Sequence, residues 1–290
     1  MNWWILYEKE DYQKNKEYVN LYFKECEKYH IPLTLVLKEE LGIVIKNPET
    51  EFYIRGEKCA KPTLVINRSR DYLLARHFEL AGIKVCNDSF VTLIGNDKAL
   101  AYSYAVQKGI PVLTSYYGNI QPKEDPYVLK SLHGHGGKEV FLVENSRKEE
   151  SSSMEQKSEV KRESFEQMEF YKKKDFLCQE FADEAGKDVR VYIIGNRIIT
   201  AMLRSNESDF KSNYTLGGQV KEYHLNAEEE SLVKKVIEGL EIGLAGIDFV
   251  FHQGKLYFNE IEDVVGARML YANTKIDIVA EYVAYLYKIS

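Results

Sequence analysis

The sequence lacks the features that would indicate several common protein classes. Its four cysteines form no CxxC pair and have no histidine at zinc spacing, which argues against a structural zinc site or a disulfide framework. No apolar run approaches the roughly 18 residues needed to cross a bilayer. The first residues, MNWWILYEKED, have neither a basic region nor a cleavage site. We therefore expect a cytoplasmic protein with reduced thiols.

The charge balance also excludes a class of partner. The net charge is −6, which gives no broad attraction to nucleic acid or to an anionic membrane. We expect neither partner. The length of 290 residues is sufficient for one large domain or for two to three small ones with a well-buried core.

Hydrophobic periodicity divides the chain into two regions with different predicted architectures. The first ninety residues alternate strand and helix signals, for example a strand at 3–7, a helix at 11–29 and a strand at 33–37, which predicts a parallel α/β layer. Beyond residue 176 longer strands are joined by tight turns at Gly195-Asn196 and Gln253-Gly254, which is typical of α+β structure. Between them, residues 145–164 are charged and carry a serine run, which fits either a solvated helix or a mobile insertion.

Three carboxylates stand in otherwise apolar strands near the C-terminus. Asp248 interrupts AGIDFVF, and Glu260 and Glu262 interrupt LYFNEIED. A buried acid is costly unless it is paired or bound to metal, and these two stretches contain no lysine or arginine. The pattern therefore favours a metal site over an ion pair. Oxygen ligands suit Mg²⁺ or Mn²⁺, and Glu260 and Glu262 share one strand face.

Lysines and glycines upstream are suited to phosphate. Lys130 ends a predicted strand, and Gly134, Gly136 and Gly137 follow it, so that backbone N–H groups can close over phosphates while the lysine neutralises charge. The alternative is a hairpin turn with surface histidines. Lys98 begins a predicted helix, where it is either a second phosphate contact or a solvated lysine beside a cap. The sequence has no Walker loop and no dinucleotide fingerprint.

A second group of polar residues lies on the strands that follow. Gln179, Glu180 and Phe181 stand where a strand ends, and they suit either an adenine edge or a plain edge strand. Asp188 and Arg190 alternate with valines, so both side chains share the polar face of their strand.

A loop with cations continues this group. Arg204, Lys211 and Asn213 bracket a loop that ends in Gly217-Gly218, which suits a γ-phosphate or an acyl phosphate. A loosely ordered polar loop is the alternative.

In this order the pieces resemble the ATP-grasp superfamily, and most closely its RimK-type branch of ribosomal-protein glutamate ligases and lysine-biosynthesis amino-group ligases. The resemblance covers about residues 97–266 and is strongest from Gln179 to Gly218. It implies an α/β N-terminal (pre-ATP-grasp) domain at 1–92, a central lobe with the glycine-rich loop at 93–178, and a C-terminal lobe with the metal site at 179–290. ATP would lie between the two lobes.

The resemblance also implies roles for single residues. Contacts to ATP are expected from Lys98, Lys130, Gly134, Gly136, Gly137, Gln179, Glu180, Phe181, Asp188, Lys211 and Asn213. Metal ligands are expected at Asp248, Glu260 and Glu262. The candidates for holding the acyl phosphate and the oxyanion during catalysis are Arg190, Arg204 and Lys211.

Two departures from the family pattern concern residues that could contact the substrate. The family usually has Glu-x-Asn where this chain has Glu260-Ile261-Glu262, so Glu262 either adds a charge to the metal site or faces substrate. The following segment, DVVGARMLY, departs from the usual Ser-Pro-Gly, and its Arg268 is either a carboxylate anchor or a surface arginine. Arg68, at the end of a predicted strand, could grip a substrate carboxylate or form an interdomain ion pair.

The implied activity is ATP-dependent joining of a carboxylate to an amine through an acyl phosphate, with ATP as co-substrate, two Mg²⁺ (or Mn²⁺) ions, and release of ADP and phosphate. The acceptor would be a small molecule or a peptide, and the added group an amino acid such as glutamate. The alternatives are a kinase of the same fold and a regulatory protein that binds nucleotide without turnover. The resemblance also favours a homodimer or tetramer.

Overall fold

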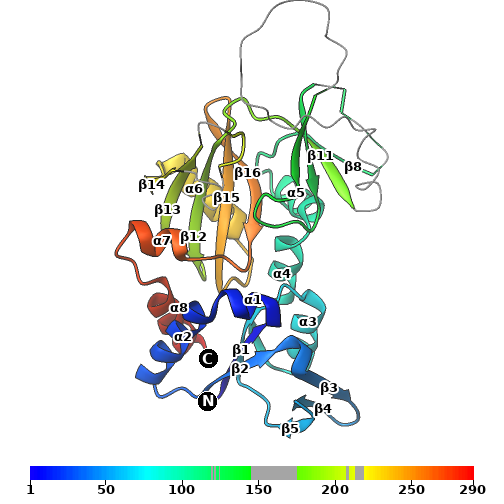
Figure 1. The fold of residues 1–290 in the computed structure, drawn as a ribbon, viewed down its shortest axis with the longest axis vertical. Coiled ribbons are helices and arrows are strands. Elements are labelled where there is room, and N and C mark those ends of the chain that lie inside the picture. The colour runs from blue at the N-terminus through cyan, green and yellow to red at the C-terminus, as the bar shows by residue number, and fades with distance from the viewer. Residues whose placement is uncertain (119, 121, 124, 145–174, 207–208, 213–218) are drawn as a thin grey trace, which may run out of the picture.

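The computed structural model describes residues 1–118, 120, 122–123, 125–144, 175–206, 209–212 and 219–290 (Figure 1). The described strands form four sheets, in the orders β2-β1-β6-β7, β3-β4-β5, β10-β9-β11-β8 and β14-β13-β12-β15-β16. The predicted combination of α/β and α+β structure is confirmed. The charged segment at 145–164 lies outside the described residues.

The N-terminal domain is built on a parallel sheet. Its central strand β1 (Trp3–Tyr7) is fully buried and pairs in parallel with β2 (Leu33–Leu37) and β6 (Leu64–Arg68), and β7 (Lys84–Cys86) adds to the edge. Helices α1 (Lys9–Lys14), α2 (Lys16–Lys28) and α3 (Tyr72–Leu80) connect these strands. The single helix predicted at 11–29 is in fact two, because Asn15 leaves helical geometry at φ −123° and ψ 18°.

A small antiparallel sheet projects from this domain (Figure 1). It consists of β3 (Leu41–Ile45), which the periodicity predicts, and of β4 (Thr50–Ile54) and β5 (Glu57–Cys59), which it does not. A short 3-10 turn (Lys38–Glu40) precedes it.

The middle of the chain forms two helices followed by an antiparallel sheet. The helices are α4 (Ser89–Gly95) and α5 (Lys98–Gln107), and their first turns are capped by the side chains of Asp88 and Asp97. The strands are β8 (Ser115–Tyr117), β9 (Tyr127–Ser131), β10 (Val140–Val143) and β11 (Phe176–Glu180). A strand predicted at 111–115 starts only at Ser115, although Val112 bridges Phe258.

The five-stranded sheet has two chemically different faces. Its strands are β12 (Lys187–Ile194), β13 (Arg197–Ser205), β14 (Gln219–Tyr223), β15 (Leu244–His252) and β16 (Lys255–Glu262). Val189 and Val191 pack in the core under α4, α5 and α6 (Ala227–Ile237). Asp188 and Arg190 lie on the opposite face, as their alternation predicts.

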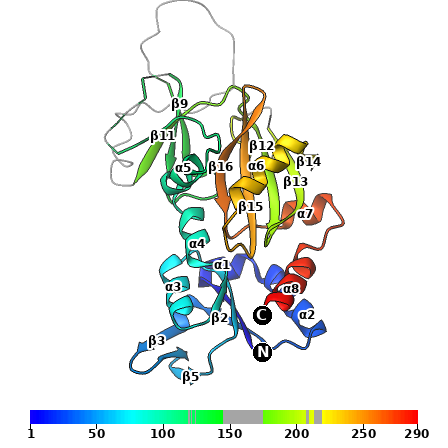
Figure 2. The same ribbon diagram turned by 180° about the vertical axis from the view of Figure 1, so that it is seen from behind.

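The C-terminus returns to the first domain. Helix α7 (Arg268–Asn273) leads to α8 (Ile278–Ile289), which lies beside α2 and brings the two termini together (Figures 1 and 2). Tyr22 and Tyr282 meet edge to face at 6.2 Å between ring centroids. One core therefore joins the N-terminal sheet to the lower half of the five-stranded sheet. Among the described helices, none has the length and apolar character to span a bilayer.

Candidate active site

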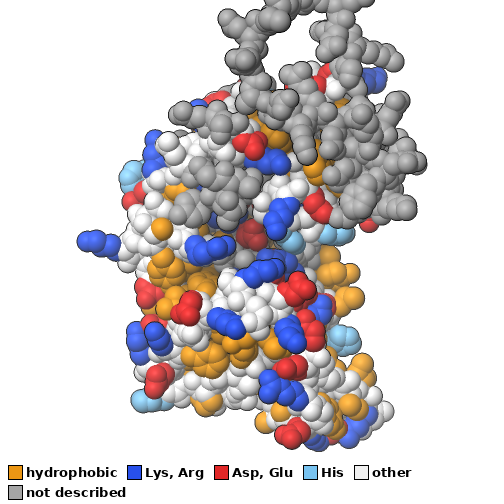
Figure 3. Space-filling model, viewed as in Figure 1, with side chains coloured by type: hydrophobic (Ala, Val, Ile, Leu, Met, Phe, Trp, Pro, Cys, Tyr) orange, Lys and Arg blue, Asp and Glu red, His pale blue; other side chains and the backbone are white. Residues whose placement is uncertain are grey.

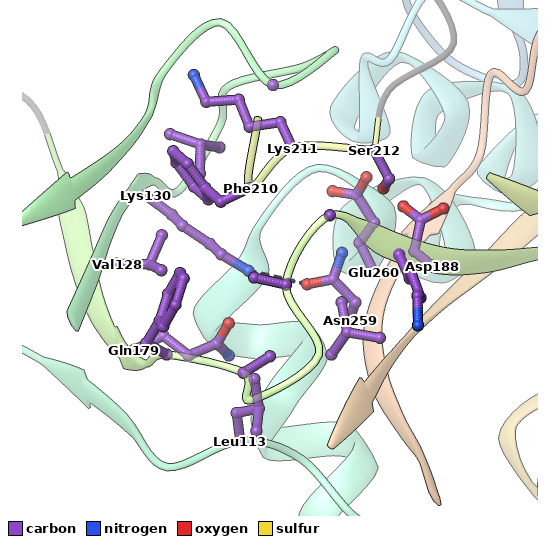
Figure 4. A pocket seen from close by; sticks show the side chains of 18 of the residues that line it. Leu113, Val128, Lys130, Gln179, Asp188, Phe210, Lys211, Ser212, Asn259 and Glu260 are labelled. Carbon is purple, nitrogen blue, oxygen red and sulfur yellow. Dashed lines mark hydrogen bonds between the residues drawn. The ribbon is translucent and has the colours of Figure 1, made fainter. Parts of the chain in front are cut away.

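A cavity lies between the β9–β11 sheet and the five-stranded sheet, and we call it the interlobe cavity (Figure 4). Its open space is about 850 Å³ with the mouth included. Its apolar lining includes Leu113, Val128, Phe181, Phe210 and Val250. An apolar slot of this kind accepts a flat heterocyclic ring.

The interlobe cavity also has a cationic part. The Lys130 ammonium extends to the Asn259 side chain and donates to its Oδ1 at 2.8 Å (Figure 4). Burial lowers the pKa of Lys130 to about 8. Lys98 Nζ donates to the Gly134 carbonyl at 2.6 Å and lies 3.6 Å from Glu260 Oε2. Two ammonium groups together with an apolar slot are what a nucleotide polyphosphate requires.

The glycine-rich loop borders this cationic part. Gly136 and Gly137 have φ of 66° and 72°, the left-handed region in which side chains are strained. Gly134 is favoured for a different reason, because a Cβ there would lie 3.1 Å from the Cβ atoms of both Glu139 and Ser131. The loop lines the cavity at all three positions, and its predicted contact with phosphates stays a prediction.

The predicted adenine contacts also line the interlobe cavity. Gln179 is buried, and its Nε2 donates to Ser115 Oγ at 2.9 Å. The backbone N–H of Glu180 donates to the Thr114 carbonyl at 2.8 Å, and β11 ends there. The main chain of Phe181 therefore lies beyond the strand pairing, where its N–H and C=O can face a ligand.

A network of ion pairs crosses the polar face of the five-stranded sheet. Asp248 is fully buried, and it accepts from Arg190 Nε and Nη2 at 2.7 and 2.6 Å and from Arg204 Nη2 at 2.7 Å. Arg204 also holds Asp188 through two hydrogen bonds of 2.5 and 2.6 Å. Burial opposes ionisation, but the two arginines lower the pKa of Asp248 below its ordinary value.

This network corrects one expectation. The sequence favoured metal over an ion pair at Asp248 because its own strand carries no cation, yet the ion pairs are present. Arg190 comes from β12, which pairs with β15, and Arg204 comes from β13, the next strand beyond β12. The sequence around Asp248 does not reveal either partner. Asp248 also faces Glu260 directly across β15 and β16. Its role as a metal ligand stays a prediction.

The two glutamates of β16 line different cavities. Glu260 lines the interlobe cavity together with Asp188 and Ser212 (Figure 4). Glu262 lines a second cavity and lies 3.6 Å from Arg190 Nη2. Burial raises the pKa of Glu262 despite Arg190. Within the described residues no cluster of three acidic, histidine or cysteine side chains forms a complete metal site.

We call this second cavity the arginine cavity. It lies where the N-terminal domain meets the five-stranded sheet, and it adjoins the interlobe cavity because Arg204 and Gly136 line both. The cations that line it are Lys14, Arg68, Arg70, Lys138, Arg190, Arg204 and Arg268, and the described acids are Asp11 and Glu262. Lys and Arg side chains gather across the middle of this face of the molecule, at the level of α1 and just above it (Figure 3).

The structure places the remaining predicted residues as follows. Lys211 lines the interlobe cavity, and its Nζ lies 5.4 Å from the centre of the Phe210 ring. Asn213 lies outside the described residues. Arg68 is buried and donates to the Val265 carbonyl at 3.0 Å, so it links the domains through a backbone group rather than an ion pair. Arg268 is exposed at the start of α7 and lines the arginine cavity.

Several residues of these cavities were not predicted from the sequence. Asn259 is the partner of Lys130, and Asp11 is the partner of Arg70 at 2.6 Å. A signal for Asp11 and Arg70 was available, since they follow β1 and β6, and the carboxyl ends of parallel neighbours meet at one sheet edge. No such signal marks Asn259, which pairs with a lysine from another sheet.

Comparison with known proteins identifies the family of the chain. Residues 113–286, well over half of the chain, match the sequence model of the RimK-like ATP-grasp domain. A probable alpha-L-glutamate ligase of Histophilus somni strain 129Pt is 29% identical over 223 residues, which cover 73% of this chain and 70% of that protein.

Solved structures share the fold across nearly the whole chain. The ATP-grasp ligase PsnB, in complex with a minimal precursor, superposes with a TM-score of 0.69 at 16% identity and covers 99% of this chain and 98% of its own. The VanG D-Ala:D-Ser ligase of Enterococcus faecalis gives a TM-score of 0.71 at 16% identity, with the same coverage. The chain belongs to the RimK-like ATP-grasp family.

Proposed function

We propose that this ATP-grasp ligase joins a carboxylate to an amine, with an acyl phosphate as intermediate and ATP as the source of the phosphoryl group. The observation that carries the proposal is the pair of adjoining cavities with Arg204 and Gly136 in common. One has an apolar slot and lysines for a nucleotide, and the other has the excess positive charge that an anionic substrate requires.

The reaction would take place where the cavities meet. An oxygen of the substrate carboxylate attacks the γ-phosphorus of ATP, the bond between that phosphorus and the β-γ bridging oxygen breaks, and ADP leaves. The amine nitrogen then attacks the acyl carbon, the bond from that carbon to the phosphate oxygen breaks, and phosphate leaves while the nitrogen loses a proton to solvent. No protein nucleophile is needed, because phosphorylation itself activates the carboxylate.

The chain's own residues supply positioning and charge. We assign Lys98 and Lys130 to the phosphates, and Gly134, Gly136 and Gly137 to the loop that keeps water from the acyl phosphate. Arg204 lies at the junction of the cavities and is the residue best placed to stabilise developing negative charge. Arg190 and Lys211 flank it from the two sides.

The donors present fit a magnesium ion that is completed by nucleotide. Mg²⁺ is commonly held by one or two carboxylates together with substrate phosphates rather than by a protein cage. Glu260 faces the cavity and Asp248 lies directly opposite it on the next strand, so these two carboxylates would hold the ion. When bound, the ion would neutralise phosphate charge. Asp248 would have to exchange an arginine contact for it.

The proposal also names the classes of the acid and amine substrates. The basic wall of the arginine cavity favours an acid, and the Histophilus somni relative is described as a probable glutamate ligase. We propose an acidic amino acid such as glutamate as the amine, and a small molecule or peptide as the acid that is activated.

Release of ADP and phosphate from Mg-ATP tests the proposal. The assay would supply pooled amino acids and short acidic peptides, with controls that omit the amine or the carboxylate. Release that depends on both substrates, with an amide product seen by mass spectrometry, is the expected result. ADP formed without free phosphate would indicate a kinase, and intact ATP binding with no turnover in any pool would count against a ligase of this substrate class.

A further inference from the structure

We propose that Glu262 binds the amino group of the amine substrate and so selects an amine that also carries carboxylates. This inference rests on the proposed function and assigns a role to the residue that stands where the family usually has asparagine. It differs from a role in metal binding, which the position alone would suggest.

The first argument is the placement of the side chain. Glu262 lines the arginine cavity and is absent from the walls of the interlobe cavity, whereas Glu260, two residues earlier, shows the reverse. Two residues along a strand span about 7 Å, so the two carboxylates can serve different ligands. Glu262 therefore faces the space in which a substrate, rather than the nucleotide, would lie.

The second argument is that Glu262 keeps its hydrogen-bonding capacity. No hydrogen bond to its carboxylate is formed within the described residues, and its nearest cation, Arg190 Nη2, lies at 3.6 Å. Arg190 directs Nε and Nη2 to Asp248 at 2.7 and 2.6 Å instead. Glu262 can accordingly accept N–H groups from a ligand.

The third argument is the balance of charge in the cavity. Seven described cations line it, and they still outnumber the acids when Asp188 and Asp248, which hold Arg204 and Arg190, are added to the two acids of the lining. Carboxylates of a ligand are therefore attracted and an ammonium group is repelled. Of the two described acids, Asp11 is engaged by Arg70 at 2.6 Å and by Lys14 at 3.7 Å. Glu262 is the remaining described acid that can receive a positive nitrogen. A neutral asparagine at this position would leave the nitrogen among like charges.

Binding of matched probes tests the assignment. The pairs are L-glutamate with glutarate and L-aspartate with succinate, which differ only in the amino group. Each is titrated calorimetrically into the full chain with Mg²⁺ and a non-hydrolysable ATP analogue. We expect the wild-type protein to bind the amine-bearing member of a pair about tenfold or more tightly, since a charge-assisted hydrogen bond is lost in the other.

Two substitutions separate substrate binding from metal binding. Glu262→Asn restores the residue typical of the family and Glu262→Gln keeps the length, and both should abolish the preference for the amine. Affinity for the Mg-nucleotide should change by less than about twofold, because Glu262 lies outside the interlobe cavity in which the nucleotide would bind. Asp11→Asn is the matched control, which removes an acid of the same cavity and should leave the ratio between paired probes unchanged.

Three outcomes would overturn the inference. They are a wild-type protein without preference within either pair, an unchanged preference in both Glu262 variants, and a tenfold loss of Mg-nucleotide affinity in Glu262→Asn with the preference kept. If neither pair binds while the Mg-nucleotide does, the inference fails but the ligase proposal survives with another amine. If the Mg-nucleotide itself does not bind, the proposed function fails. Thermal unfolding of each variant verifies that it is folded.

Discussion

The two adjoining cavities differ in how far acids balance their cations. The described lining of the interlobe cavity has five cations (Lys98, Lys130, Lys187, Arg204 and Lys211) and four acids (Glu180, Glu184, Asp188 and Glu260). The described lining of the arginine cavity has seven cations and two acids, with Arg204 common to both cavities. A nucleotide brings a metal ion of its own, so its cavity can contain acids, whereas an organic acid must obtain positive charge from the protein. The difference thus indicates which ligand each cavity is built for.

The largest effect is expected from Asp248→Ala, which removes the buried carboxylate that accepts hydrogen bonds from Arg190 and Arg204. Arg190 and Arg204 would be left buried without their shared partner, at a cost of about 3–5 kcal/mol in the free energy of unfolding. Chemical denaturation measures this loss, and turnover should fall with it. A fully stable Asp248→Ala protein would contradict the importance of the ion-pair network.

Lys130→Met should affect the interlobe cavity alone. The loss of a buried charge-assisted contact is expected to weaken binding of ATP about 10- to 100-fold. Equilibrium titration with a non-hydrolysable analogue measures the affinity. Binding of the organic acid in the arginine cavity should be retained, and an equal loss at both cavities would contradict their separation.

The pKa of Lys130 predicts a pH dependence with opposite signs for binding and stability. Because the pKa is lowered to about 8, raising the pH from 7 to 9 removes its charge, and ATP affinity should fall about tenfold. Between pH 8 and 10.5 the Lys130 amine binds more protons in the unfolded chain than in the folded protein. Its contribution therefore makes the free energy of unfolding rise with pH in this range. Lys130→Arg, which stays charged, should lose the dependence of affinity on pH.

The smallest effect is expected at the exposed rim of the arginine cavity. Arg268→Ala should raise the KM of the anionic substrate about two- to fivefold, because an exposed charge contributes roughly 1 kcal/mol or less. Nucleotide affinity should not change. Arg197→Ala, which removes an exposed pair with Glu281 outside both cavities, is the control and should leave both constants unaltered.

Much of this site could be predicted because alternation along a strand is a local property. Asp188 and Arg190 share the polar face opposite the valines, and the glycines at 134, 136 and 137 border a cavity, as expected. Pairing between strands is not local. The partners of Asp248 stand 58 and 44 residues away in the sequence, so an acid that reads as a metal ligand proved to be held by two arginines.

The sequence by itself determined the family, the α/β and α+β regions and the residue types needed for a nucleotide, because periodicity and motif order are local properties of the chain. Only the tertiary structure decided that Glu260 and Glu262 line different cavities and that Arg204 belongs to both. It also brought Arg68, Arg70 and Lys14 of the first domain to the same cavity as Arg190 and Arg268. The physical reason is that a cavity is formed by packing between elements. Its charge therefore comes from residues on strands and helices that lie far apart in the sequence.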